Sequence, residues 1–167
     1  DDALFEKRHY KHAERSGLDY DRFKALVKDV WARRADVPAL IQQVADKARA
    51  KGIPMLSHDD TQAETRQFFH NLGATTVEFP MTMPAVEAAR ANGDLIIFGS
   101  PNAVRGGSHI GSLGAGDMVE AGFCDVLASD YYYPAMLAAI DRLDREKRAD
   151  RLSLWSLIST DPAKAMG

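Results

Sequence analysis

One cysteine, no long apolar run and no excess of positive charge limit what this 167-residue sequence encodes. A single thiol excludes a disulfide framework and a zinc site built from several thiolates, and it suits a reducing compartment. No stretch approaches the roughly 20 apolar residues of a membrane span, so we expect no membrane partner. A net charge of −3 provides no basic surface for nucleic acid. Because no signal-like leader opens the chain, we expect a cytoplasmic protein.

Short apolar runs set the predicted fold class. With 46% hydrophobic and 27% charged residues, the composition is that of a globular region with a core. Each apolar run is followed by a segment with helical features, which predicts an α/β fold with a parallel sheet buried on both faces. We treat 1–167 as a single α/β region. The predicted strands are 53–56, 75–79, 95–99 and 124–128.

The helical segments differ in how clearly the sequence marks them. Helices are predicted over 4–15, 20–34 and 36–52, the second amphipathic and the third with a buried stripe. The members of that stripe are Leu40, Ile41, Val44 and Ala48. Thr61 and Glu64 form a capping box that opens the helix after the first strand. The segment 100–114 is predicted to be a long Gly-rich loop.

Polar and unusual residues gather where the predicted strands end. The segments that lead into the strands carry no comparable clusters. In parallel α/β folds the ligand site lies beyond the carboxyl ends of the strands. We therefore expect one cleft formed by four clusters, at 57–60, 78–82, 101–111 and 129–133.

Three of these strand ends carry candidate metal ligands or bases. His58 can bind a metal, with Asp59 as a further ligand or as an orienting partner; alternatively, His58 bonds a neighbouring carbonyl and the aspartates cap the next helix. Glu78 lies inside an apolar strand, so its carboxylate needs a metal or a cationic partner. Asp130 can hold a metal or orient an attacking water, or it can be an ordinary turn residue.

The segment 101–111 combines residues that suit an anion. Glycine backbone N–H groups can face phosphate oxygens, and an arginine fork can bind two of them. The sequence predicts phosphate or carboxylate binding, with a surface loop as the alternative reading. The candidates are Arg105, Gly106, Gly107, Ser108 and His109. Tyr131, in the cluster after the last strand, is a candidate wall of the cleft, although aromatic residues there often serve packing.

Taken together and in order, four motifs resemble a known family. The motifs SHDD, EFPMT, GSPNAVRGGSHIG and ASDYYYP are similar to the phosphonate-metabolism branch of the amidohydrolase superfamily, in particular to diphosphatases of the PhnM type. The closing STDPAKAMG is similar to an ending common in amidohydrolases. The family fold is a (β/α)8 TIM barrel. The resemblance implies that this chain supplies strands five to eight of such a metal-dependent hydrolase.

The resemblance also implies roles. His58 would be the strand-five metal ligand, and Asp130 the strand-eight aspartate that holds metal and activates water. The segment from Asn102 to His109 would line a phosphorylated small-molecule substrate. The implied cofactor is a divalent metal, zinc or of the manganese, magnesium or nickel type. The implied reaction is release of diphosphate from a ribose 1-phosphonate 5-triphosphate.

Departures from the family leave alternatives open. The His-x-His motif of the first strand is absent, and Glu78 stands where many members have a histidine. A full barrel needs about 250 residues, so we expect this chain to be part of a longer amidohydrolase-like polypeptide or half of an assembly, and a homo-oligomer is left open. The alternative functions are another amidohydrolase, such as a dihydroorotase-like cyclic amidase, and a non-catalytic phosphate-binding α/β module.

Overall fold

The computed structural model describes residues 2–106 and 113–166. Contacts divide the chain into two compact units, Asp1–Val44 and Ala45–Gly167, and each is described by itself. That residues 1–167 form a single region stays a prediction.

The first unit consists of helices whose apolar residues remain largely exposed. Its elements are α1 (Asp2–Ser16), α2 (Tyr20–Ala32), the 3-10 helix η1 (Arg34–Asp36) and α3 (Val37–Ala50), whose last turns lie in the second unit. Asp19 caps α2, since its carboxylate accepts a hydrogen bond from the N–H of Arg22 at 2.9 Å. No residue of α2 is buried. In α3 Leu40 and Val44 are exposed and only Ala45 is buried, so the predicted buried stripe is wrong.

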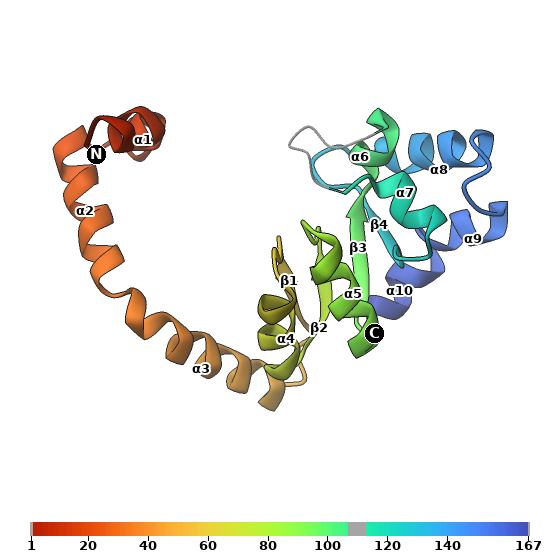
Figure 1. Cartoon of the computed structure of the whole chain (residues 1–167), viewed down its shortest axis with the longest axis horizontal. Coiled ribbons are helices and arrows are strands. Elements are labelled where there is room, and N and C mark those ends of the chain that lie inside the picture. The colour runs from red at the N-terminus through yellow and green to blue at the C-terminus, as the bar shows by residue number, and fades with distance from the viewer. Residues whose placement is uncertain (1, 107–112, 167) are drawn as a thin grey trace. The chain divides into compact units, whose positions relative to one another are not determined.

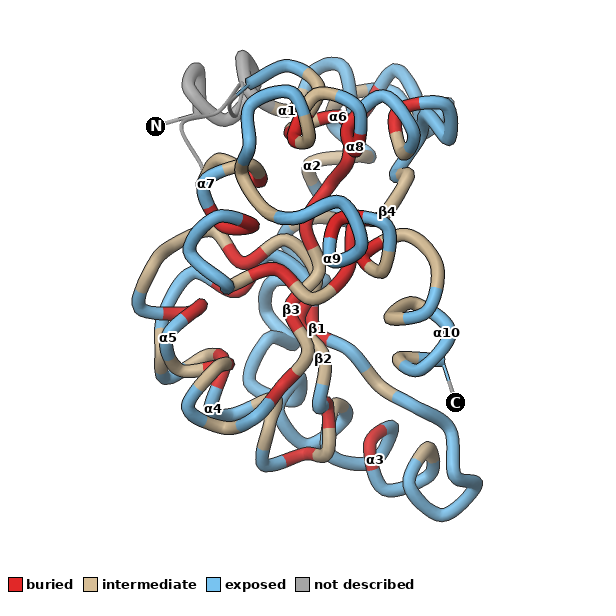
Figure 2. The backbone as a smooth tube through the Cα atoms, turned by 90° about the vertical axis from the view of Figure 1, so that its right-hand side faces the viewer, coloured by how far each residue is buried: buried red, intermediate tan, exposed pale blue. Residues whose placement is uncertain are grey.

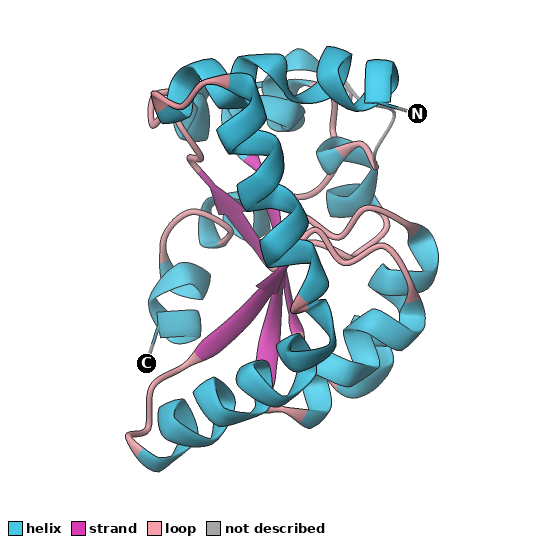
Figure 3. Ribbon diagram, turned by 90° about the vertical axis from the view of Figure 1, so that its left-hand side faces the viewer, coloured by secondary structure: helices cyan, strands magenta, loops and turns pink. Residues whose placement is uncertain are grey.

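The second unit contains one sheet of four parallel strands (Figure 1). The strands are β1 (Met55–His58), β2 (Ala74–Glu78), β3 (Leu95–Gly99) and β4 (Val126–Ala128), in the order β1-β2-β3-β4. Figure 3 shows helices beside the strands, and every connection between neighbouring strands contains a helix. The predicted fold class, α/β built of parallel (β/α) units, is confirmed. The first strand begins two residues later than predicted, which places His58 within it.

Seven helices follow the first strand among the described residues. They are α4 (Ala63–Asn71), α5 (Met83–Asn92), α6 (Ser100–Arg105), α7 (Ala115–Glu120), α8 (Ala135–Arg145), α9 (Arg151–Ser156) and α10 (Thr160–Met166). The cap of α4 is Gln62, whose side chain makes no capping hydrogen bond, so the predicted capping box is wrong. Part of the predicted 100–114 loop is helix α6. Within the described ranges, no helix combines the length and apolar character that crossing a membrane requires.

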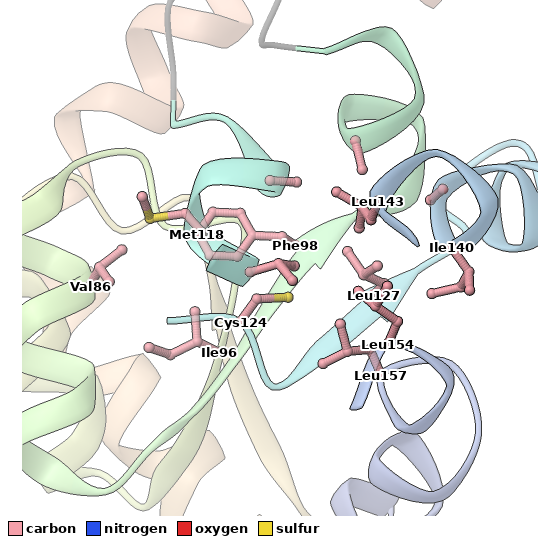
Figure 4. Packing of buried hydrophobic residues seen from close by; sticks show 14 of the residues in the cluster. Val86, Ile96, Phe98, Met118, Cys124, Leu127, Ile140, Leu143, Leu154 and Leu157 are labelled. Atoms are coloured by element: carbon pink, nitrogen blue, oxygen red, sulfur yellow. The ribbon is translucent and has the colours of Figure 1, made fainter. Parts of the chain in front are cut away.

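One face of the sheet carries most of the hydrophobic core (Figure 4). Its strand members are Val77, Ile96, Phe98 and Leu127. Val86 of α5, Met118 of α7 and Leu143 of α8 belong to the same buried cluster. Figure 2 shows buried residues concentrated along the sheet and on the inner sides of these helices. On the opposite face Val126 is buried, whereas Leu56 is 52% exposed and Ile97 is partly exposed, so the expected burial of this face is confirmed only at β4.

The single cysteine lies inside this cluster, and we expect it to make the fold less stable at alkaline pH. Burial, and next the charge of Asp125, raise the pKa of the Cys124 thiol from 9.0 to about 12. Between these values the unfolded chain loses the thiol proton and the folded chain keeps it. The free energy of unfolding should therefore fall as pH rises from 9 to 12, with a slope of up to about 1.4 kcal/mol per pH unit from this group. Urea unfolding of the wild type and of Cys124→Ala across this range measures the slope, and equal slopes would contradict the expectation.

Candidate active site

Three strands end in residues with left-handed backbone. Asp59 follows β1 with φ 60°, Phe79 follows β2 with φ 55°, and Asp130 comes two residues after β4 with φ 52°. This conformation costs a non-glycine residue roughly 1–2 kcal/mol, and such strain clusters at functional sites. The only other non-glycine residue with positive φ in the described ranges is Lys147, in the turn after α8. Strain therefore concentrates at the carboxyl end of the sheet, where the cleft was predicted.

His58 and Glu78 are brought together by the register of the sheet. They are the last residues of adjacent strands and pair directly, so their side chains lie on the same face. His58 Nε2 lies 4.0 Å from Glu78 Oε2, and His58 Nδ1 lies 3.1 Å from Asp59 Oδ2. The His58 side chain is half exposed and that of Glu78 is 26% exposed. Each nitrogen of this imidazole thus faces a carboxylate, and the neighbour of Glu78 is a histidine.

Asp60, the last residue of the SHDD motif, has a different role from its neighbours. Its side chain is 1% exposed and accepts a hydrogen bond from the hydroxyl of Ser57 at 2.7 Å. Asp60 Oδ2 lies 3.4 Å from Nη1 of Arg66, a completely buried arginine of α4. Asp60 therefore links the turn that follows His58 to the buried side of α4, and it does not cap that helix.

The Arg66 guanidinium also joins this turn to the opposite end of the sheet. Its Nε forms an ion pair at 3.2 Å with Oδ2 of Asp94, the residue directly before β3. Nη1 donates to the Thr76 carbonyl at 3.3 Å, and Nη2 donates to the Ala74 carbonyl. In His70 of α4, Nδ1 lies 2.7 Å from Asp94 Oδ1. The sequence did not reveal this network, because nothing in the local pattern of α4 shows which way Arg66 points.

Asp130 lies at the other edge of the sheet from His58. Their strands, β4 and β1, are separated by β2 and β3. Because neighbouring strands lie about 4.8 Å apart, the two strand ends are about 14 Å apart along the sheet. Asp130 is exposed. The shared metal role predicted for Asp130 and His58 stays a prediction.

The predicted metal centre can be tested against the donors present. A catalytic zinc site uses three protein ligands, commonly imidazole nitrogens and carboxylate oxygens. His58 and Glu78 are donors of these kinds and lie close together. Across residues 2–106 and 113–166, however, no three or more histidine, cysteine, aspartate or glutamate side chains are grouped so that they could hold a metal. The described residues therefore do not make a complete metal site by themselves.

Asn102 anchors the chain that follows α6. Its Oδ1 accepts a hydrogen bond from the N–H of Ala115 at 2.8 Å, and its Nδ2 donates to the Leu113 carbonyl at 3.3 Å. Both ends of its amide are thus used to hold the start of α7 against α6. The predicted contact between Asn102 and substrate stays a prediction.

Two further residues of the predicted anion site have clear positions. Arg105 ends α6, and its Nη1 donates to the Tyr131 hydroxyl at 2.8 Å, which links the end of α6 to the turn after β4. Tyr131 is 75% exposed. Gly106 caps α6 with φ 79°, and its N–H donates to the Asn102 carbonyl at 3.1 Å, so this amide is not free to face an anion. The predicted residues Gly107, Ser108 and His109 lie outside the described part of the chain.

Gly106 suits its position because its φ of 79° lies in the left-handed region, and Arg142 of α8 comes close to it. A Cβ there would come within 2.5 Å of the Arg142 guanidinium. That guanidinium donates from Nη1 to the Val104 carbonyl at 2.6 Å and from Nε to Glu146 Oε1 at 2.6 Å. The bond from Arg142 holds the pKa of the Glu146 carboxyl below its usual value. Through its bond to the Val104 carbonyl, Arg142 thus links α8 to the end of α6.

Comparison with known proteins finds a relative with an assigned function. The chain is 37% identical over 127 residues, 75% of its length, to the α-D-ribose 1-methylphosphonate 5-triphosphate diphosphatase of Escherichia coli (strain K12). The chain is a homologue of that diphosphatase. The resemblance read from the sequence is confirmed. The matched region is 34% of the diphosphatase, so the chain spans about a third of the length of this relative. No family profile and no solved structure matches the chain.

Proposed function

We propose that this chain forms part of the active site of a diphosphatase of phosphonate metabolism. The observation that carries the proposal is its 37% identity to the Escherichia coli diphosphatase. The substrate would be a ribose 1-phosphonate 5-triphosphate, cleaved to release diphosphate. We also propose that the chain belongs to a longer polypeptide, since the relative is about three times as long as the matched region.

Two residues beyond the strand ends suit the proposed reaction, Asp130 as a proton acceptor and Arg105 as a cation that binds phosphate oxygens. In the proposed reaction a water attacks a phosphorus of the triphosphate, and Asp130 takes or steers the proton of that water. Arg105 stabilises the negative charge that develops as diphosphate leaves, because a guanidinium binds phosphate oxygens with paired N–H groups. The hydrogen bond between Arg105 and Tyr131 supports a defined position for this guanidinium beside the turn that carries Asp130.

For the proposed metal dependence, the described residues supply only some of the ligands that a metal ion would need. A divalent metal would lower the pKa of a bound water and so provide hydroxide at neutral pH. His58 and Glu78 are two donors suited to such an ion. Because the described residues lack a third grouped ligand, further donors from elsewhere in the polypeptide belong to the proposal.

A substrate panel tests the proposal. The polypeptide that carries this chain is incubated with a ribose 5-triphosphate bearing a 1-phosphonate, with ribose 5-phosphate and with dihydroorotate, in the presence of zinc or manganese. We expect diphosphate to be released from the triphosphate alone. Hydrolysis of dihydroorotate without diphosphate release would overturn the proposal in favour of a cyclic amidase. Triphosphate binding without turnover would overturn it in favour of a binding module.

A further inference from the structure

Phe79 occupies the centre of the strand ends in a conformation that bulky residues seldom adopt. It follows Glu78 directly, and its N–H donates to the Ile97 carbonyl of β3 at 2.9 Å. In a continuing strand its side chain would lie on the same face as that of Val77, toward the helices, because side chains alternate. The left-handed turn at φ 55° instead redirects the ring. A large aromatic side chain gains nothing by itself from this conformation, so its surroundings must hold it there.

The Phe79 ring contacts the ends of both neighbouring strands. Its centroid lies 5.2 Å from that of the His58 imidazole at the end of β1, with the rings 74° apart in an edge arrangement. On the other side, a Cβ built on Gly99 at the end of β3 would lie 3.6 Å from Cε1 of the ring. Phe79 therefore lies across β2 and reaches from His58 to Gly99.

The three groups around His58 restrict it in different directions. Asp59 lies near Nδ1 at 3.1 Å, and Glu78 lies near Nε2 at 4.0 Å, so the carboxylates face the two nitrogens. Carboxylates alone leave the half-exposed imidazole free to turn, because at these distances their attraction is partly screened by water. The nearly perpendicular Phe79 ring adds an apolar contact that favours one orientation of the imidazole.

We propose that Phe79 is a positioning residue that holds the His58 imidazole with Nε2 directed toward Glu78. Its consequence for catalysis rests on the proposed function, but the orientation of His58 is a property of the fold alone. The left-handed conformation of Phe79 then has a purpose: it brings an aromatic ring to the face of the sheet that carries the histidine.

The test combines a spectroscopic readout with kinetics on the polypeptide that carries this chain. The His58 ring resonances, assigned with His58→Gln, are recorded by NMR for the wild type and for Phe79→Leu, Phe79→Gly and Phe79→Tyr. We expect Phe79→Leu and Phe79→Gly to shift and broaden these resonances, and Phe79→Tyr to preserve them. Diphosphate release should show kcat reduced by up to about 10²-fold in Phe79→Leu with KM changed little, as expected for a misplaced group.

Two features of the design keep the result interpretable. Glycine accepts the left-handed backbone without strain, so Phe79→Gly remains a folded test even if Phe79→Leu unfolds. Phe68→Leu is the matched control, because Phe68 is also in an edge-on ring pair, with Phe69 at 5.2 Å on α4. Unchanged His58 resonances in Phe79→Gly would overturn the inference. Absence of diphosphatase activity in the wild type would overturn the proposed function and leave the NMR result valid.

Discussion

Replacing Asp130 by asparagine is expected to reduce the rate of diphosphate release by about 10²–10⁴-fold, the contribution typical of a general base. The substitution removes the proton acceptor and keeps the size of the side chain. Asparagine also tolerates the left-handed backbone found at this position, so the turn after β4 should keep its form. The rate is measured from diphosphate produced under saturating and limiting triphosphate.

Two comparisons separate loss of the base from loss of structure. Asp141→Asn removes a carboxylate of α8 whose side chain is 64% exposed and which pairs with Arg145, so its activity should match that of the wild type. The circular dichroism and urea midpoint of Asp130→Asn should also be unchanged, because Asp130 is exposed. A rate within twofold of the wild type would exclude Asp130 as the base.

Arg66→Leu is expected to lower the free energy of unfolding by about 3–5 kcal/mol. Arg66 is completely buried, and its removal leaves the carboxylates of Asp60 and Asp94, each 1% exposed, without their cationic partner. The carbonyls of Ala74 and Thr76 also lose a donor. Breaking a buried ion pair is costly because the remaining charge stays out of water. Urea unfolding followed by circular dichroism measures the change.

Arg145→Ala is the matched control for this experiment. Arg145 forms an ion pair with Asp141 on α8, and both side chains are mostly exposed, at 72% and 64%. Exposed pairs contribute 1 kcal/mol or less, so the free energy of unfolding should change little. If Arg66→Leu were no more destabilising than Arg145→Ala, the buried network would not be what secures the turn after β1.

The fold was predictable where local patterns decide it. The apolar runs that end near His58, Glu78 and Gly99 mark strands because parallel strands bury continuous apolar segments. Helix α6 was missed because the glycines beyond it suggest a loop, whereas Pro101 is well suited to the first turn of a helix. The exposed stripe of α3 was also misjudged, since periodicity shows that a helix has an apolar side and does not show what covers it.

The sequence predicted where the candidate site lies, at the strand ends, but not which side chains contact one another there. The resemblance to a (β/α)8 barrel implies that consecutive strands are neighbours, and the structure pairs His58 with Glu78 at the ends of β1 and β2. The roles of Phe79 and Arg66 could not be inferred, because both depend on distant partners. For Phe79 the decisive fact is a backbone torsion that phenylalanine does not favour, and no local motif announces it.

Asn102 holds the start of α7 to α6 through both ends of its side-chain amide. By binding the Leu113 carbonyl and the N–H of Ala115, it fixes the far end of the segment that starts at the cap of α6. Closing a chain between fixed ends costs free energy that grows only with the logarithm of its length, about 0.6 kcal/mol per doubling. Residues can therefore be inserted, removed or exchanged between these anchors at little expense to the sheet.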